Sequence, residues 1–176
     1  MTSAPSLLGI SAGDWLQALS GIIGVALTVL VTLWIEGRRR HSEERADLRI
    51  VDTAVRDLSS ALDACEAPLP QDQDLRSRLA LATAAQKRLH EAHPGYEFAR
   101  AQTVVRDLNI FRELRYLDAA LAGQTATINS EYNILLGGSG RVTDAVLQVN
   151  QAKVSEIAAY LRPFVIRASE ALATKL

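Results

Sequence analysis

The stretch DWLQALSGIIGVALTVLVTLWIEGRRRH, residues 14–41, decides how the rest of the chain is interpreted. From Trp15 to Ile35 it contains no Asp, Glu, Lys, Arg or His. A helix over 15–35, at about 1.5 Å per residue, is roughly 30 Å long, which is the thickness of a bilayer's hydrocarbon core. We therefore expect a transmembrane helix over 15–35, with Trp15 and Trp34 as interfacial anchors.

Two other interpretations of this run are a buried core helix and a cleaved signal peptide. A core helix is usually shorter or carries a polar stripe. A signal peptide needs a positively charged start, and residues 1–14 contain no Lys or Arg. The transmembrane helix is the interpretation that the length and the flanks favour.

The charges on the two sides of the run predict an orientation. Four basic residues follow it, namely Arg38, Arg39, Arg40 and Arg45. Asp14 is the only charged side chain before it. Because Lys and Arg resist translocation, the tail 1–14 is expected outside and the C-terminal domain in the cytoplasm. The four arginines are also expected to contact lipid head groups, an attraction that Glu43 and Glu44 weaken.

Small and hydroxyl-bearing residues recur every four positions within the run. They are Ser20, Gly24, Thr28 and Thr32. Residues with this spacing share one side of a helix and allow a second helix to approach closely. We expect this stripe to mediate self-association, although Gly, Ser and Thr are also common in helices that have no such contact.

The remaining chain is expected to be helical throughout. Residues 36–66 form an amphipathic helix in which Cys65, the single cysteine, is a core residue. Its apolar positions are spaced by three and four, at Leu48, Val51, Val55, Leu58, Leu62 and Cys65. Residues 72–176 supply further helices, with Asp72 or Asp74 capping the next one. The fold class is therefore all-α, with a cytoplasmic helical bundle or an elongated stack of helical hairpins after the anchor.

Proline and glycine predict where these helices end. Breaks are expected at 67–74, Pro94-Gly95, 137–140 and Pro163, the last being a kink or an end. Whether Gly123 breaks the third helix is left open, because glycine disfavours a helix without forbidding it. The expected core face of that helix is Val104, Leu108, Phe111, Leu114, Leu117 and Leu121.

No group of residues meets the requirements of a catalytic or metal site. The best candidate is HEAHPGYE, with His90, Glu91, His93 and Glu97, but the proline and glycine interrupt it and the ligand set is incomplete. GGSGR, residues 137–141, lacks the Gly-Lys-Ser/Thr ending of a phosphate-binding loop. We expect no enzyme activity, no catalytic residue, no metal and no cofactor.

These observations favour a membrane-anchored scaffold or protein-interaction module that self-associates. Its expected partners are the lipid bilayer, further copies of the chain and an unknown cytoplasmic protein. A net charge of −1 argues against nucleic acid as a partner. The alternative is a membrane-acting effector or pore subunit whose copies assemble through the apolar run.

Overall fold

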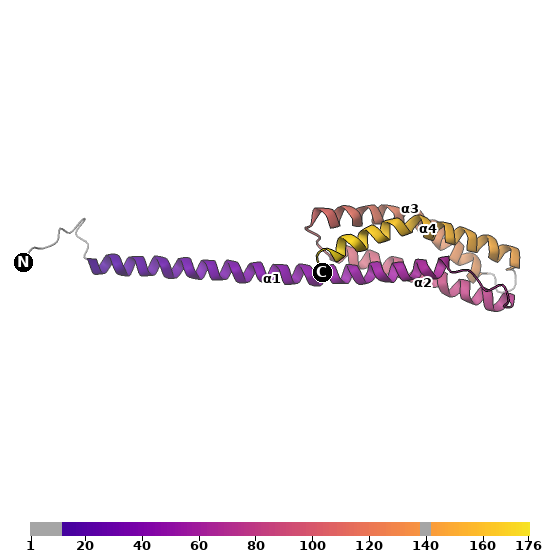
Figure 1. The fold of residues 1–176 in the computed structure, drawn as a ribbon, viewed down its shortest axis with the longest axis horizontal. Helices are drawn as coiled ribbons and strands as arrows, with labels where there is room; N and C mark the ends of the chain where they lie inside the picture. The colour runs from indigo at the N-terminus through magenta and orange to yellow at the C-terminus, as the bar shows by residue number, and fades with distance from the viewer. Residues whose placement is uncertain (1–11, 138–141) are drawn as a thin grey trace, which may run out of the picture. The chain divides into compact units, whose positions relative to one another are not determined.

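The computed structural model describes the backbone of residues 12–137 and 142–176, and the side chains from residue 23 onward within these ranges. This part of the chain consists of α-helices and contains no strand, so the all-α prediction is confirmed. The helices are α1 (Ala12–Glu66), α2 (Leu75–Gln102), α3 (Leu108–Leu136) and α4 (Asp144–Ala173) (Figure 1). The chain divides into two compact units, Met1–Glu43 and Glu44–Leu176.

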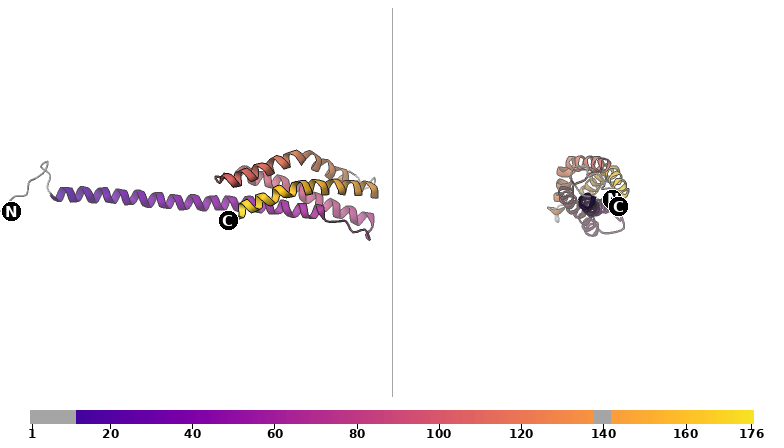
Figure 2. Two further views of the ribbon diagram at one scale, coloured as in Figure 1. Left: turned by 45° about the horizontal axis from the view of Figure 1, so that its top comes forward. Right: turned by 90° about the vertical axis from the view of Figure 1, so that its left-hand side faces the viewer.

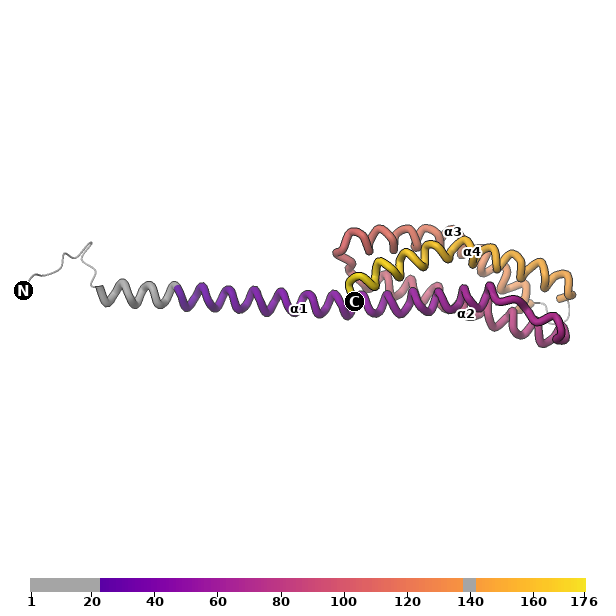
Figure 3. The backbone as a smooth tube through the Cα atoms, viewed as in Figure 1, coloured from indigo at the N-terminus to yellow at the C-terminus, as the bar shows by residue number. Residues whose placement is uncertain are grey.

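The second unit is an antiparallel helical bundle, which confirms the predicted bundle. The connections 67–74 and 103–107 lie at opposite ends of it, so successive helices run in opposite directions (Figure 3). Viewed along the helices, the four elements surround a shared core (Figure 2). All six positions expected to form the core face of the first bundle helix are at most 2% exposed, namely Leu48, Val51, Val55, Leu58, Leu62 and Cys65.

The bundle helices begin where side chains cap their free N–H groups. Asp74 accepts a hydrogen bond from Ser77 N at 3.3 Å, as predicted for the start of α2. Asp107 accepts from the N–H groups of Asn109 and Ile110 at the start of α3. Hydrogen bonds from the side chain and then the backbone N–H of Ser77 hold the pKa of Asp74 below the usual value, and those from the backbone N–H of Ile110 and from Lys175 do the same for Asp107.

Neither proline ends its helix, so the predicted end of α2 at Pro94-Gly95 is wrong. Helix α2 continues to Gln102 and α4 continues past Pro163 to Ala173. A proline costs about 3 kcal/mol inside a helix. The residues beyond each proline are buried in the core, Tyr96 and Ala99 in α2 and Val165 and Leu172 in α4. That burial outweighs the local cost.

Glycine has two different outcomes in the bundle. Gly123 lies inside α3, which runs without interruption to Leu136. Gly137 is the C-cap of that helix. The rest of the predicted turn at 137–140 lies outside the described residues.

The predicted transmembrane helix is contradicted. None of the described helical residues form a stretch long and apolar enough to cross a membrane. In α1 the described side chains begin at residue 23 and the first charged one is Glu36, followed by Arg38. The single-pass location, with an outside N-terminus and a cytoplasmic domain, is therefore corrected.

Candidate functional site

Residues 23–35 of α1, called the apolar segment below, are exposed at every position. The large apolar side chains are between 51% exposed, at Val29, and 67% exposed, at Val25. They stand at 23, 25, 27, 29–31 and 33–35 and therefore on all sides of the helix, whereas a surface helix of a globular protein has one apolar stripe. A contiguous apolar surface of this kind marks an interaction site.

The predicted stripe lies partly within this segment. The Thr28 hydroxyl donates to the carbonyl of Gly24 and the Thr32 hydroxyl to that of Thr28, each at 2.8 Å. Both hydroxyl protons are thus used within the helix, which leaves only their lone pairs for a partner. A Cβ on Gly24 would meet nothing within 4 Å. The side chains of Ser20 and of the predicted anchor Trp15 lie outside the described ones.

The four arginines that follow the apolar run, for which lipid contacts are predicted, differ in their contacts within the chain. Arg39 pairs with Glu43 at 2.8 Å and Arg40 with Glu36 at 3.1 Å, each one turn away on the same helix. The Arg38 guanidinium lies over the Trp34 ring, 4.3 Å from its centroid. Among the described residues, neither Arg38 nor Arg45 makes an ion pair. These two cations are therefore available to a partner.

Two separate pockets lie along the surface where α1 and α2 of the second unit meet, and we call the two together the alanine groove. Its small residues are Ala54 and Ala64 of α1 and Ala84, Ala85, Ala92, Gly95 and Ala99 of α2. One part is a cavity of about 390 Å³ between exposed Ile50 and Phe98. The other part, near the connection 67–74, is a cavity of about 330 Å³. The lining positions recur every three or four residues and therefore share one face of each helix.

A chain of polar side chains crosses the bundle core. Lys153 Nζ donates to Glu131 Oε1 at 3.1 Å. Asn150 Nδ2 donates to Glu131 Oε2 at 2.8 Å, and Gln86 Nε2 donates to Asn150 Oδ1 at 2.5 Å. Because an ionised carboxylate only accepts hydrogen bonds, Glu131 fixes the orientation of both amides. Gln86 Oε1 is left without a partner among the described residues.

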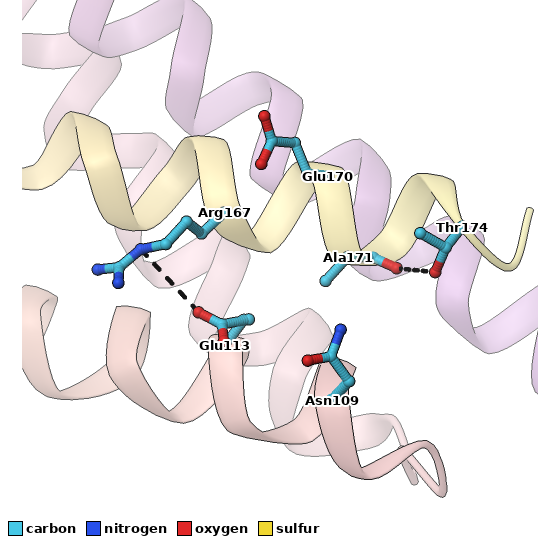
Figure 4. A pocket seen from close by; sticks show the side chains of 6 residues that line it. All are labelled: Asn109, Glu113, Arg167, Glu170, Ala171 and Thr174. Atoms are coloured by element: carbon cyan, nitrogen blue, oxygen red, sulfur yellow. Dashed lines mark hydrogen bonds and ion pairs between the residues drawn. The ribbon is translucent and has the colours of Figure 1, made fainter.

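A polar pocket of about 260 Å³ lies between the first turns of α3 and the last turns of α4 (Figure 4). Glu113 lies 4.0 Å from Arg167 and 3.0 Å from Arg112, while the carboxylate of Glu170 points away from Glu113 (Figure 4). Thr174 donates to the carbonyl of Ala171. Arg112 donates to Oε1 of Glu113, whereas Oε2 is buried without a hydrogen-bond partner among the described residues.

The histidine cluster does not converge on one point. His90 Nδ1 lies 2.9 Å from Asn129 Oδ1, and its ring stacks on Tyr132. His93 is buried, and its Nε2 is 3.5 Å from Glu97 Oε1, which is too long for a good hydrogen bond. Across the described residues no three His, Cys, Asp or Glu side chains gather as metal ligands would.

The sequence analysis does not predict two features, the alanine groove and the polar chain. The alanine groove has a signal in the three- and four-residue spacing of alanines on α2. The polar chain has a weaker one, because Gln86, Glu131 and Asn150 stand at core positions of their helices. Comparison of the chain with protein-family models, curated protein sequences and solved structures finds no match.

Proposed function

We propose that this chain is a non-enzymatic interaction module that self-associates through the apolar segment. One observation carries the proposal: every large apolar side chain in residues 23–35 is more than half exposed. Burial of one Val or Leu side chain contributes about 1.5–3 kcal/mol. Covering several of them at once is a strong driving force for association.

Further copies of the chain are the simplest partner for this surface. A helix that is apolar on all sides needs cover on more than one side, which one flat partner surface does not provide. Each added copy brings both another apolar segment and another groove. The charges that follow the segment are of both signs, so copies do not repel one another strongly there.

The proposal is tested by placing a charge in the segment. The Leu30→Glu variant of the full chain introduces a carboxylate at the centre of the apolar surface. Its matched control is Leu108→Glu, which makes the same change at an exposed leucine at the start of α3. Sedimentation velocity across protein concentrations measures the mass of each chain.

We expect the unmodified chain and Leu108→Glu to sediment as dimers or larger species, and Leu30→Glu to shift towards monomer by at least tenfold in dissociation constant. A monomeric unmodified chain at every concentration contradicts self-association. Equal association of both variants would show that the segment is not the contact surface.

A further inference from the structure

We propose that the apolar segment of one copy binds in the alanine groove of a second copy, with Trp34 as the anchoring side chain. This inference rests on the proposed self-association and names the receptor surface for it. The contact is heterologous, because two different surfaces of the chain meet.

The wider part of the groove has the size and lining of a site for a bulky apolar side chain. Its floor includes Ala92 and Gly95, whose small size keeps the space between the helices open. Ile50 and Phe98 stand beside it, 56% and 66% exposed. A volume of about 390 Å³ lies within the range of pockets that hold apolar ligands. Trp34, itself 60% exposed, is the largest side chain of the segment and of a type that anchors interfaces.

The two pockets together extend over a length comparable with the segment. On α2 the residues that line one or the other pocket run from Leu81 to Ala99, which corresponds to roughly 27 Å of helix. The apolar segment is roughly 20 Å long by the same measure. A helix laid on a floor of alanine and glycine approaches closely, which allows dense packing along that length.

Charges at the two surfaces complement each other. The charged residues at the larger pocket are Asp57 and Glu91, whereas Arg88 lines the other pocket, and Asp57 makes no ion pair among the described residues. Arg38 follows Trp34 by one helical turn and is also without an acidic partner. Insertion of Trp34 therefore brings an unpaired guanidinium towards an unpaired carboxylate. Attraction of this kind sets the register of a contact more than its strength.

The decisive variant fills the groove without disturbing the helix. A Cβ on Gly95 meets nothing within 4 Å and Gly95 is exposed, so the side chain of Gly95→Arg starts in open space. Arginine is a better helix former than glycine, so the variant is expected to fold. The control is Gly123→Arg, because Gly123 is also an open position inside a helix and lies outside the groove.

We expect Gly95→Arg to weaken self-association of the full chain at least tenfold in sedimentation velocity, and Gly123→Arg to leave it unchanged. If Gly95→Arg associates like the control, the groove is not the receptor and the inference is overturned. Proposed self-association still stands in that case, provided that Leu30→Glu dissociates the chain. A monomeric unmodified chain overturns both proposals.

Exchange of charges tests the register. Arg38→Asp and Asp57→Arg should each weaken association about threefold, as expected for an exposed ion pair turned into a repulsive one. The double variant restores the attraction with its direction reversed, and we expect association close to that of the unmodified chain. Additive losses in the double variant would contradict the pairing of Arg38 with Asp57.

Discussion

Two parts of the same helix, α1, show how differently apolar residues are used. In residues 23–35 they stand on all sides of the helix and are all exposed. In residues 48–65 the six apolar residues that stand three and four positions apart are all buried in one core cluster with residues of α2, α3 and α4, whereas Ile50, which is out of that spacing, is 56% exposed. Both parts are rich in Leu, Ile and Val, so the amount of apolar surface does not distinguish them. The spacing of the apolar residues distinguishes them. A single apolar stripe on one side of a helix can be covered by other helices of the same chain, whereas apolar side chains on all sides of residues 23–35 are left exposed.

The strongest test of this comparison truncates one leucine in each part. Leu58 is fully buried in the bundle, and Leu58→Ala is expected to lower the free energy of unfolding by about 2–5 kcal/mol. Leu30→Ala should lower it by less than about 0.5 kcal/mol when the chain is dilute, because its side chain is already exposed. Urea unfolding followed by circular dichroism measures both. Similar losses in the two variants would show that the segment is part of the folded core.

The buried face of α1 between Leu48 and Cys65, which we call its seam, is the part of the fold that the sequence predicts best. Its pattern depends only on helical geometry, which places residues three and four apart on one side. Which face of α3 is buried is harder to predict from the sequence. Leu108 and Phe111 are exposed, whereas Ile110 between them is buried. Three neighbouring apolar residues fit more than one helical phase, and the packing of the other helices selects the phase.

The prolines show where local rules fail. Pro94 and Pro163 each predict a break, because proline lacks an N–H group. The outcome depends on the core residues that follow each proline, such as Tyr96 and Val165, and these are buried by helices that lie far away in the sequence. The polar chain of Gln86, Asn150 and Glu131 shows the same limitation, since its partners come from three helices. Sequence places each residue on a face but does not show which residues meet.

A second test of moderate size asks whether the bundle core depends on this polar chain. Asn150→Leu removes the donor to Glu131 Oε2 and the acceptor of Gln86 Nε2, and these two atoms lose their hydrogen-bond partner in the core, while Lys153 still pairs with Glu131 Oε1. We expect a loss of about 1–3 kcal/mol in the free energy of unfolding. The control Gln148→Leu alters an exposed amide on the same helix and should change it by at most about 0.5 kcal/mol. A stabilised Asn150→Leu chain would show that apolar packing alone specifies this core.

The smallest effect expected is a pH dependence from Cys65, the last residue of the buried seam. Burial raises the pKa of the Cys65 thiol to about 12, chiefly because the thiolate loses its hydration there. In the unfolded chain the thiol ionises near its ordinary value of 9.0. The folded state is therefore fully favoured below about pH 9, and stability falls as the pH rises from there towards 12.

Between pH 8 and pH 10 this group should lower the free energy of unfolding by about 1 kcal/mol. The matched chain is Cys65→Ala, which has no thiol to ionise and keeps Tyr96. Burial and a hydrogen bond to Asp118 also raise the pKa of Tyr96, so its own alkaline loss is common to both chains. Subtracting the two urea-unfolding profiles isolates the thiol. Parallel profiles from pH 8 to pH 10 would mean that water reaches Cys65, and that the seam is less tightly closed at its end than at Leu58.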